Sequence, residues 1–280
     1  MTELGNGYFD SQARELADRS EYAFAASKFL SPAEQIAFAE SVSRLGDGDR
    51  SRCYFYGGSL NSERREAVFV PSYIETSPFR SGAKAIFDEA RTEEFLRITD
   101  GFDPAEIHGI VALEVRGSSY VTLSHRDYMG SILALGIERD VVGDIAVTGD
   151  FSAVVFVRGV IADYITESLT KAGRDTVSVS RTNLKKDFII PRKFISLSLV
   201  SASRRLDSVV AALTNSSRAD AKELCTSGSV ELNHVPTTSP DGRVNEGDTV
   251  TVRGHGKFLI DSFGGETRSG RLRLSVSRFA

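Results

Sequence analysis

The sequence is poor in cysteine, with only Cys53 and Cys225 among its 280 residues. The two lie far apart in the chain, and no set of possible metal ligands stands near either of them. The four histidines are scattered as well. This pattern predicts neither a disulfide framework nor a zinc site, so we expect no metal, no cofactor and a reducing compartment, the cytoplasm.

Long apolar runs are also missing. No stretch of about 18 consecutive apolar residues occurs, which is roughly the length that a membrane-spanning helix needs. The first residues, MTELGNGYFDSQARELADRS, contain no apolar run of signal-peptide length. We therefore expect neither secretion nor a membrane partner. The hydrophobic content of 41% is sufficient for two or three buried cores, and we expect a monomer.

Charge is distributed unevenly along the chain, although its formal total is only −4. Residues 181–280 contain 16 Lys and Arg against 10 Asp and Glu, which gives +6 and leaves −10 for residues 1–180. The basic end is the one expected to meet an anionic partner. An uneven but merely solvated surface is the alternative.

Residues 1–104 predict a mixed helical and hairpin region. Apolar residues recur at helical spacing over 11–46, where Ser31-Pro32 is expected to open a second helix. The segments 52–58 and 67–73 predict a β-hairpin. This region shows no recognisable chemistry.

Residues 105–182 predict the order β-α-β-β-α-β, which is the ferredoxin-like plait that RNA-recognition modules also use. The second helix is expected over 161–173, and Gly143-Asp144 is expected to turn into the next strand. Because the strands lack the aromatic residues that stack on RNA bases, we assign Phe156 to the core rather than to a base-binding platform. The fold alone does not establish a function.

A basic connector is expected at 183–202, followed by a small module at 203–280. The spacing predicts a helix from Leu206 to Leu213 and a second one after Ser217, with Gly228 releasing the chain into a strand. Arg218 and Lys222 stand one turn apart in the second helix. Because like charges at this spacing slightly destabilise a helix, we interpret them as a face that binds RNA phosphates.

The pattern RLDSVVAAL, SSRADAKELCTSGSVELNH and VNEGDTVTVRGHGKF resembles the alpha-L RNA-binding domain named after the fourth small-subunit ribosomal protein, called here the S-four domain. It covers roughly 203–262. Family members commonly have Val-Asn-Gly where this chain has Leu232-Asn233-His234, a difference that concerns the turn. The segment SHRDYMGSILALGIERDVVGDIAV at 124–147 is similar to bacterial YlmH-type proteins, in which an RNA-binding plait precedes an S-four domain.

This resemblance implies an α+β protein with a central ferredoxin-like plait and a C-terminal alpha-L domain. It also implies a cytoplasmic, non-enzymatic protein that binds ribosomal RNA, and tRNA as a further candidate, on the large ribosomal subunit. Rescue of stalled, tRNA-obstructed subunits is the expected process; cell division and photosystem assembly have been proposed for relatives. The residues we assign to RNA contact are Lys185, Lys186, Arg192, Lys193, Arg204, Arg205, Ser217, Arg218, Lys222, Asn233, Arg253 and Lys257.

Three catalytic interpretations compete with structural ones. His125-Arg126-Asp127 matches the tripeptide of a kinase catalytic loop, but the other kinase motifs are missing, and a helix-capping cluster is favoured. Arg205-Leu206-Asp207 matches the tripeptide around the catalytic aspartate of pseudouridine synthases, yet those enzymes place a catalytic domain after the S-four domain. No glycine-rich loop supports a methyltransferase. An RNA-modifying enzyme stays the alternative function.

Overall fold

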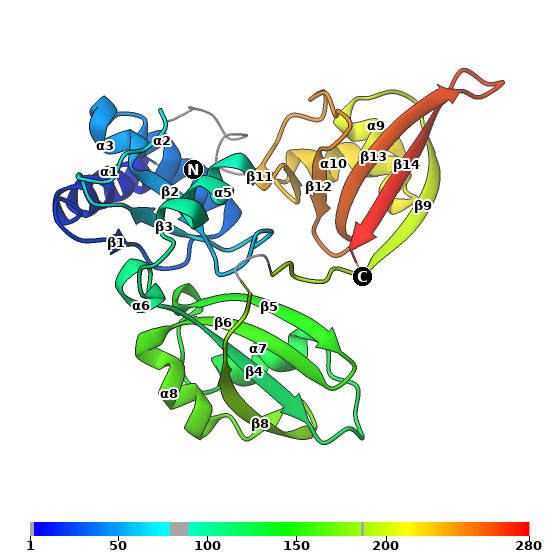
Figure 1. Ribbon diagram of the computed structural model, residues 1–280. Helices are drawn as coiled ribbons and strands as arrows, with labels where there is room; N and C mark the ends of the chain where they lie inside the picture. The colour runs from blue at the N-terminus through cyan, green and yellow to red at the C-terminus, as the bar shows by residue number, and fades with distance from the viewer. Residues whose placement is uncertain (1–2, 79–88, 186–187, 280) are drawn as a thin grey trace. The chain divides into compact units, whose positions relative to one another are not determined.

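The computed structural model describes residues 3–78, 89–185 and 188–279. The chain divides into two compact units, the first ending at Pro191 and the second beginning at Arg192. Helices and strands are mixed in both, as Figure 1 shows, which confirms the predicted α+β class. In the described ranges no helix is long and apolar enough to cross a membrane.

The first part of the first unit is a small sheet with the strand order β1-β3-β2 and helices around it. Ser31 caps α2 through a reciprocal pair of bonds with Glu34, which confirms the predicted helix start. The hairpin of β2 and β3 is antiparallel, also as predicted. The elements are α1 (Glu3–Arg19), β1 (Ala25–Ala26), α2 (Pro32–Val42), α3 (Asp47–Ser51), β2 (Cys53–Tyr56), β3 (Glu66–Phe69), α5 (Glu89–Ile98) and α6 (Pro104–Ile107).

The second part of the first unit is the plait. Its strands follow the order β5-β6-β4-β8-β7 and are antiparallel throughout, which is the predicted ferredoxin-like topology. The elements are β4 (Ile110–Gly117), α7 (His125–Leu133), η1 (Arg139–Val141), β5 (Val142–Gly149), β6 (Ser152–Arg158), α8 (Gly159–Ser168), β7 (Lys171–Ala172) and β8 (Asp175–Thr182).

Two predictions in the plait were wrong. The second helix ends at Ser168 rather than at 173, because residues 171–172 turn back to pair with β8 through Gly173, whose φ is +56°. Gly143 and Asp144 lie inside β5 and not in a turn. The Asp144 carboxylate accepts hydrogen bonds from the backbone N–H groups of residues 63 and 64, so it joins the plait to the hairpin connection of the small sheet.

Different parts of the first unit pack against the two faces of the plait sheet. Leu113, Val155 and Val157 belong to the core beneath α7 and α8. On the opposite face Phe156, only 1% exposed, packs in a cluster with Tyr56 and Phe95 from the N-terminal part of the unit. Phe156 is therefore a core residue, as predicted. The part of the sheet face around it is closed by the protein's own side chains.

The second unit consists of two short helices on one face of a six-stranded sheet, ordered β11-β10-β12-β13-β14-β9 (Figure 1). Val209, Ala221, Cys225 and Val276 are among the fully buried residues between helices and sheet. The elements are β9 (Phe194–Ser201), α9 (Leu206–Thr214), α10 (Arg218–Thr226), β10 (Val230–Leu232), β11 (Val235–Pro236), β12 (Thr249–Val252), β13 (Gly256–Glu266) and β14 (Leu272–Phe279).

The strand β9 lies in the interval 183–202, which was expected to be a connector. It pairs with β14 along its whole length, from Phe194 opposite Phe279 to Ser201 opposite Leu272. Serines alternate here with Ile195, Leu197 and Leu199, which is the pattern of a half-buried strand, and this signal was overlooked. The connection between the two units is therefore shorter than expected.

Candidate nucleic-acid interface

A buried carboxylate connects the two helices of the second unit. Asp207, in the first turn of α9, is 3% exposed. Arg205 donates from Nε and Nη2 to its two oxygens, both at 3.2 Å. Arg218, the first residue of α10, donates from Nε and Nη2 to Oδ2 at 3.3 and 3.2 Å. Asp207 is thus the helix N-terminal carboxylate that was predicted, and it also has a second role that was not.

Hydrogen bonding sets the charge state of this cluster. Burial alone would raise the pKa of Asp207, but the hydrogen bonds from Arg205 and Arg218 lower it below its ordinary value. The bond to Asp207 in turn raises the pKa of Arg205. The Asp207 carboxylate therefore binds two guanidinium groups, and the cluster of Asp207, Arg205 and Arg218 has a net positive charge.

Both guanidinium groups stay accessible. The side chains of Arg205 and Arg218 are 44% and 60% exposed. A guanidinium has five N–H donors, and each of these groups uses its Nε and Nη2 on Asp207, so Nη1 is left for a ligand. Lys222 is exposed one turn further along α10. This arrangement suits the phosphate groups of a nucleic acid backbone.

Local sequence explains why the helices begin here. Ser217 accepts a hydrogen bond from the Asp220 N–H and the Ser217 N–H donates to Asp220, a capping box that starts α10. Asn215 adopts a left-handed conformation with φ +52° and ends α9. Ser217 therefore has a structural role as an N-cap besides the RNA contact that was assigned to it.

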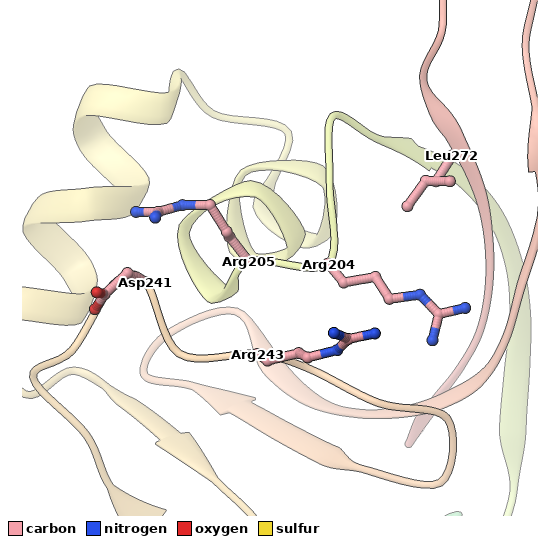
Figure 2. A pocket seen from close by; sticks show the side chains of 5 residues that line it. All are labelled: Arg204, Arg205, Asp241, Arg243 and Leu272. Atoms are coloured by element: carbon pink, nitrogen blue, oxygen red, sulfur yellow. The ribbon is translucent and has the colours of Figure 1, made fainter.

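The segment before α9 borders a pocket of about 340 Å³, shown in Figure 2. The N–H groups of Leu206 and Asp207 donate to the carbonyls of Gly242 and Pro240, both at 2.8 Å, which places the loop around Asp241 beside the start of α9. The lining residues are Arg204, Arg205, Asp241, Arg243 and Leu272.

The cations of this pocket divide into two groups. In Figure 2 the Arg204 and Arg243 side chains point the same way, whereas Arg205 points away from them. Arg204 lies over the ring of Phe263, with 4.5 Å from Cζ to the ring centroid. Arg243 was missed by sequence reasoning, because nothing in its turn-rich neighbourhood predicts that it comes close to Arg204. Exposed Arg268 and Arg271 near the end of the β13–β14 hairpin were missed too.

The side chain of Asn233 forms hydrogen bonds within the second unit. Its Nδ2 donates to Asp248 at 3.0 Å, and its Oδ1 accepts from the N–H of Thr249 at 2.9 Å. Asn233 and His234 both have positive φ, +51° and +66°, and form the two-residue turn between β10 and β11. The Leu-Asn-His sequence thus keeps a tight hairpin turn without the usual glycine.

The remaining predicted residues lie elsewhere. Arg253 is exposed in the β12–β13 turn. Lys257 and Arg192 both lie over the ring of Phe279, and Lys193 is exposed nearby in the chain. Lys185 is exposed in the first unit, and Lys186 lies outside the described residues. In the described ranges no group of histidine, cysteine or acidic residues has the geometry of a metal site.

The motif His125-Arg126-Asp127 is a helix cap. Asp127 accepts hydrogen bonds from both the N–H and the hydroxyl of Ser124, at 2.8 and 2.6 Å. Its carboxylate is thereby held at the start of α7, and this confirms the interpretation favoured from the sequence.

The two helices and their shared carboxylate lie in a small module of the S-four class. Residues 204–250 match the family described as "S4 domain", and residues 106–186 match the one described as "Putative RNA-binding domain in YlmH". The chain therefore carries a YlmH-type domain followed by an S-four domain, which confirms the resemblance found in the sequence.

Two individual proteins are similar to this chain. "Ribosome-associated protein quality control protein P2" of Bacillus subtilis (strain 168) is 26% identical over 264 residues, which cover 93% of this chain and 89% of the relative. The solved structure of "Cell division protein ylmH from Streptococcus pneumoniae" shows 19% identity and a TM-score of 0.43, covering 65% of this chain and 94% of that one.

Proposed function

We propose that this protein binds RNA through its second unit and acts as a non-enzymatic factor associated with the ribosome. The observation that carries the proposal is the pair Arg205 and Arg218, oriented by one buried carboxylate and exposed beside Lys222. Both matched domains are of RNA-binding families, and the Bacillus relative is named as ribosome-associated.

The alternative, an RNA-modifying enzyme, is not favoured. Asp207 is the residue that the pseudouridine synthase comparison would make a nucleophile, but its side chain is only 4% exposed and both of its oxygens accept hydrogen bonds from arginines. A carboxylate held in this way is a poor attacking group. Neither matched family is described as catalytic.

We further propose that the partner is the large ribosomal subunit and that the ligands are ribosomal RNA and tRNA. The protein would be a cytoplasmic monomer that acts in the rescue of stalled ribosomes. An A-form helix hides its base edges in a deep groove, so a small basic module reads mainly shape. A second contact through the first unit would add specificity, since two tethered contacts can exceed either one by roughly 10²–10⁴ in affinity.

The salt dependence of binding tests the proposed RNA interface. Full-length protein is titrated with a structured ribosomal RNA hairpin at several salt concentrations. Replacing Arg218 and Lys222 by Ala leaves Arg205 to pair with Asp207, and the denaturation midpoint of the variant shows whether the fold survives the loss of the bond between α9 and α10. We expect weaker binding and a log–log salt slope that is smaller by about 0.9 for each phosphate that the variant no longer neutralises.

A matched control distinguishes a specific interface from loss of charge. Arg14 and Arg19 are exposed on α1, outside both matched RNA-binding domains, and their replacement by Ala removes the same two charges. This variant should bind as the wild type does. Unchanged affinity and slope in the Arg218/Lys222 variant would show that these residues are only a solvated face.

A further inference from the structure

The face of the second sheet that lies opposite α9 and α10 has an unusual composition. Alternation places Leu197, Leu199, Leu274 and Val276 on the helix side, where they pack in the core. The register then brings four pairs together on the other side of β9 and β14: Phe194 with Phe279, Ser196 with Ser277, Ser198 with Ser275, and Val200 with Arg273. Because serines are small, the middle of this face is flat.

An aromatic pair stands at one end of this face. The rings of Phe194 and Phe279 meet edge to face, with centroids 4.8 Å apart. Phe194 is 45% exposed although it makes this ring contact. Phe279 orients Phe194 from one side and leaves it open to a ligand.

Cations surround the same pair. The Lys257 Nζ lies 4.7 Å from the centroid of the Phe279 ring, and the Arg192 Cζ lies 5.9 Å from it. Such cation–π contacts keep the charges next to the ring. The acids that alternation and register place on this face are Asp261, which accepts a hydrogen bond from Ser277, and Glu231, opposite Thr251 on the neighbouring strand. Asp261 thus lies beside the Ser196–Ser277 pair, next to the aromatic pair, where Ser277 already donates to it. Glu231 shares a row with Thr251 and Lys257, and three strands separate it from Phe194 on β9.

We propose that this face binds an unpaired segment of RNA, with a base stacked on Phe194 and its flanking phosphates held by Lys257 and Arg192. The inference rests on the proposed RNA-binding function and adds to it a second, single-stranded subsite. Aromatic rings beside cations on an open, flat sheet are the features that bind single strands, because every base has a π-face and every linkage a negative charge. A peptide partner would gain little from the paired cations and the row of serines.

The chain contains no tryptophan, so a Phe194→Trp variant of the full-length protein carries a single fluorescent reporter at the subsite. We expect a short oligouridine to quench this fluorescence, since stacking of a base on the indole changes its emission. Tyr120, 91% exposed in the first unit, provides the control. A Tyr120→Trp variant should show no quenching at the same RNA concentration.

Affinity gives the second measurement. Two RNAs are compared, a fully paired hairpin and the same hairpin with an unpaired uridine extension. The wild type should bind the extended RNA roughly tenfold more tightly. Phe194→Ala should lose this gain and keep the affinity for the blunt hairpin, and Phe194→Leu, which retains apolar volume, should lose it as well.

The outcomes separate the two proposals. Failure of the wild type to bind the blunt hairpin would contradict the proposed function. Quenching of the Phe194→Trp variant by oligouridine would support the single-stranded subsite on the sheet face independently of that result. Absence of quenching, or an extension that brings the same gain to Phe194→Ala, would overturn the subsite. Quenching by ribosomal proteins but not by RNA would also overturn it and would identify a protein partner instead.

Discussion

Arg218 on α10 reaches across to Asp207 on α9, with its Nη2 3.2 Å from the carboxylate Oδ2. Arg205 approaches the same carboxylate from the segment before α9. A single buried acid therefore fixes the relative position of two helices and of two exposed cations. The stability of the second unit and the proposed RNA interface therefore depend on the same carboxylate.

Asp207→Asn should destabilise the second unit. Hydrogen bonds to charged groups contribute roughly 1.5–3 kcal/mol each, but both arginines are substantially exposed, so we expect a loss of about 1–2 kcal/mol in the free energy of unfolding.

Each unit contains one buried cysteine, and burial raises the pKa of Cys225 to about 11 and that of Cys53 to about 12. Thiol labelling therefore reports opening of each unit separately.

The labelling result has a built-in control. Cys225 should react about tenfold faster in the Asp207→Asn variant, because about 1.4 kcal/mol corresponds to a factor of ten. Cys53, in the first unit, should react at the wild-type rate. Equal labelling of Cys225 in both proteins would show that Asp207 is not a structural link.

His234→Gly should stabilise the second unit modestly. His234 has φ +66°, a conformation that costs a residue with a Cβ roughly 1–2 kcal/mol. Glycine avoids this cost, but its greater conformational freedom in the unfolded chain offsets part of the gain in stability. We expect a net gain of about 0.5 kcal/mol, read from the denaturation midpoint. His234→Ala, which keeps a Cβ in the same conformation, should not produce the gain. A lower midpoint for the glycine variant would mean that the His234 side chain stabilises the hairpin.

The contribution of Glu66 to the stability of the first unit should fall as the pH rises from about 4.3, the ordinary glutamate value, towards 8. Glu66 is 0% exposed, and burial raises its pKa to about 8, although Arg158 lies 3.3 Å away and lowers it in part. The folded state then holds a proton that the unfolded state releases in this window, so the stabilisation is full below it and declines through it. The decline contributed by Glu66 is on the order of 5 kcal/mol.

A neutral isostere isolates this contribution from other titrating groups. Glu66→Gln should exceed the wild type in stability at pH 9 by more than it does at pH 5, measured by urea denaturation. Glu167 is exposed on α8, and Glu167→Gln should show no pH-dependent difference. A constant difference between Glu66→Gln and wild type at both pH values would mean that Glu66 is ionised throughout.

The position of β9 predicts where the chain can be cut. A fragment of residues 192–280 keeps β9 paired with β14 and retains the whole core of the second unit. We expect it to unfold cooperatively and to bind an RNA hairpin. A fragment of residues 203–280 lacks Leu197 and Leu199 and exposes β14 as an edge, so it should aggregate or stay unfolded. Equal solubility and equal unfolding transitions for both fragments would contradict this role of β9.

The sequence predicted those elements whose signals are local. The helices at 206–214 and 218–226 follow from apolar spacing and from the serine cap, and Gly228 ends the second one with φ +71°. β9 was missed although residues 195–199 alternate between apolar residues and serine, because the basic residues around this stretch led us to interpret it as a connector. The approach of Arg243 to Arg204 and the bond from Arg218 to Asp207 depend on how separate segments pack, and local sequence patterns do not predict such packing.

The central claim is binding to the ribosome through the second unit, and sedimentation of cell extract through a sucrose gradient tests it most directly. At moderate salt, with stalled complexes present, the wild-type protein should travel with free large subunits. The Arg218→Ala, Lys222→Ala variant should shift towards the top, while the Arg14→Ala, Arg19→Ala control should not. Wild-type protein found only at the top of a gradient in which ribosomes stay intact would contradict the account.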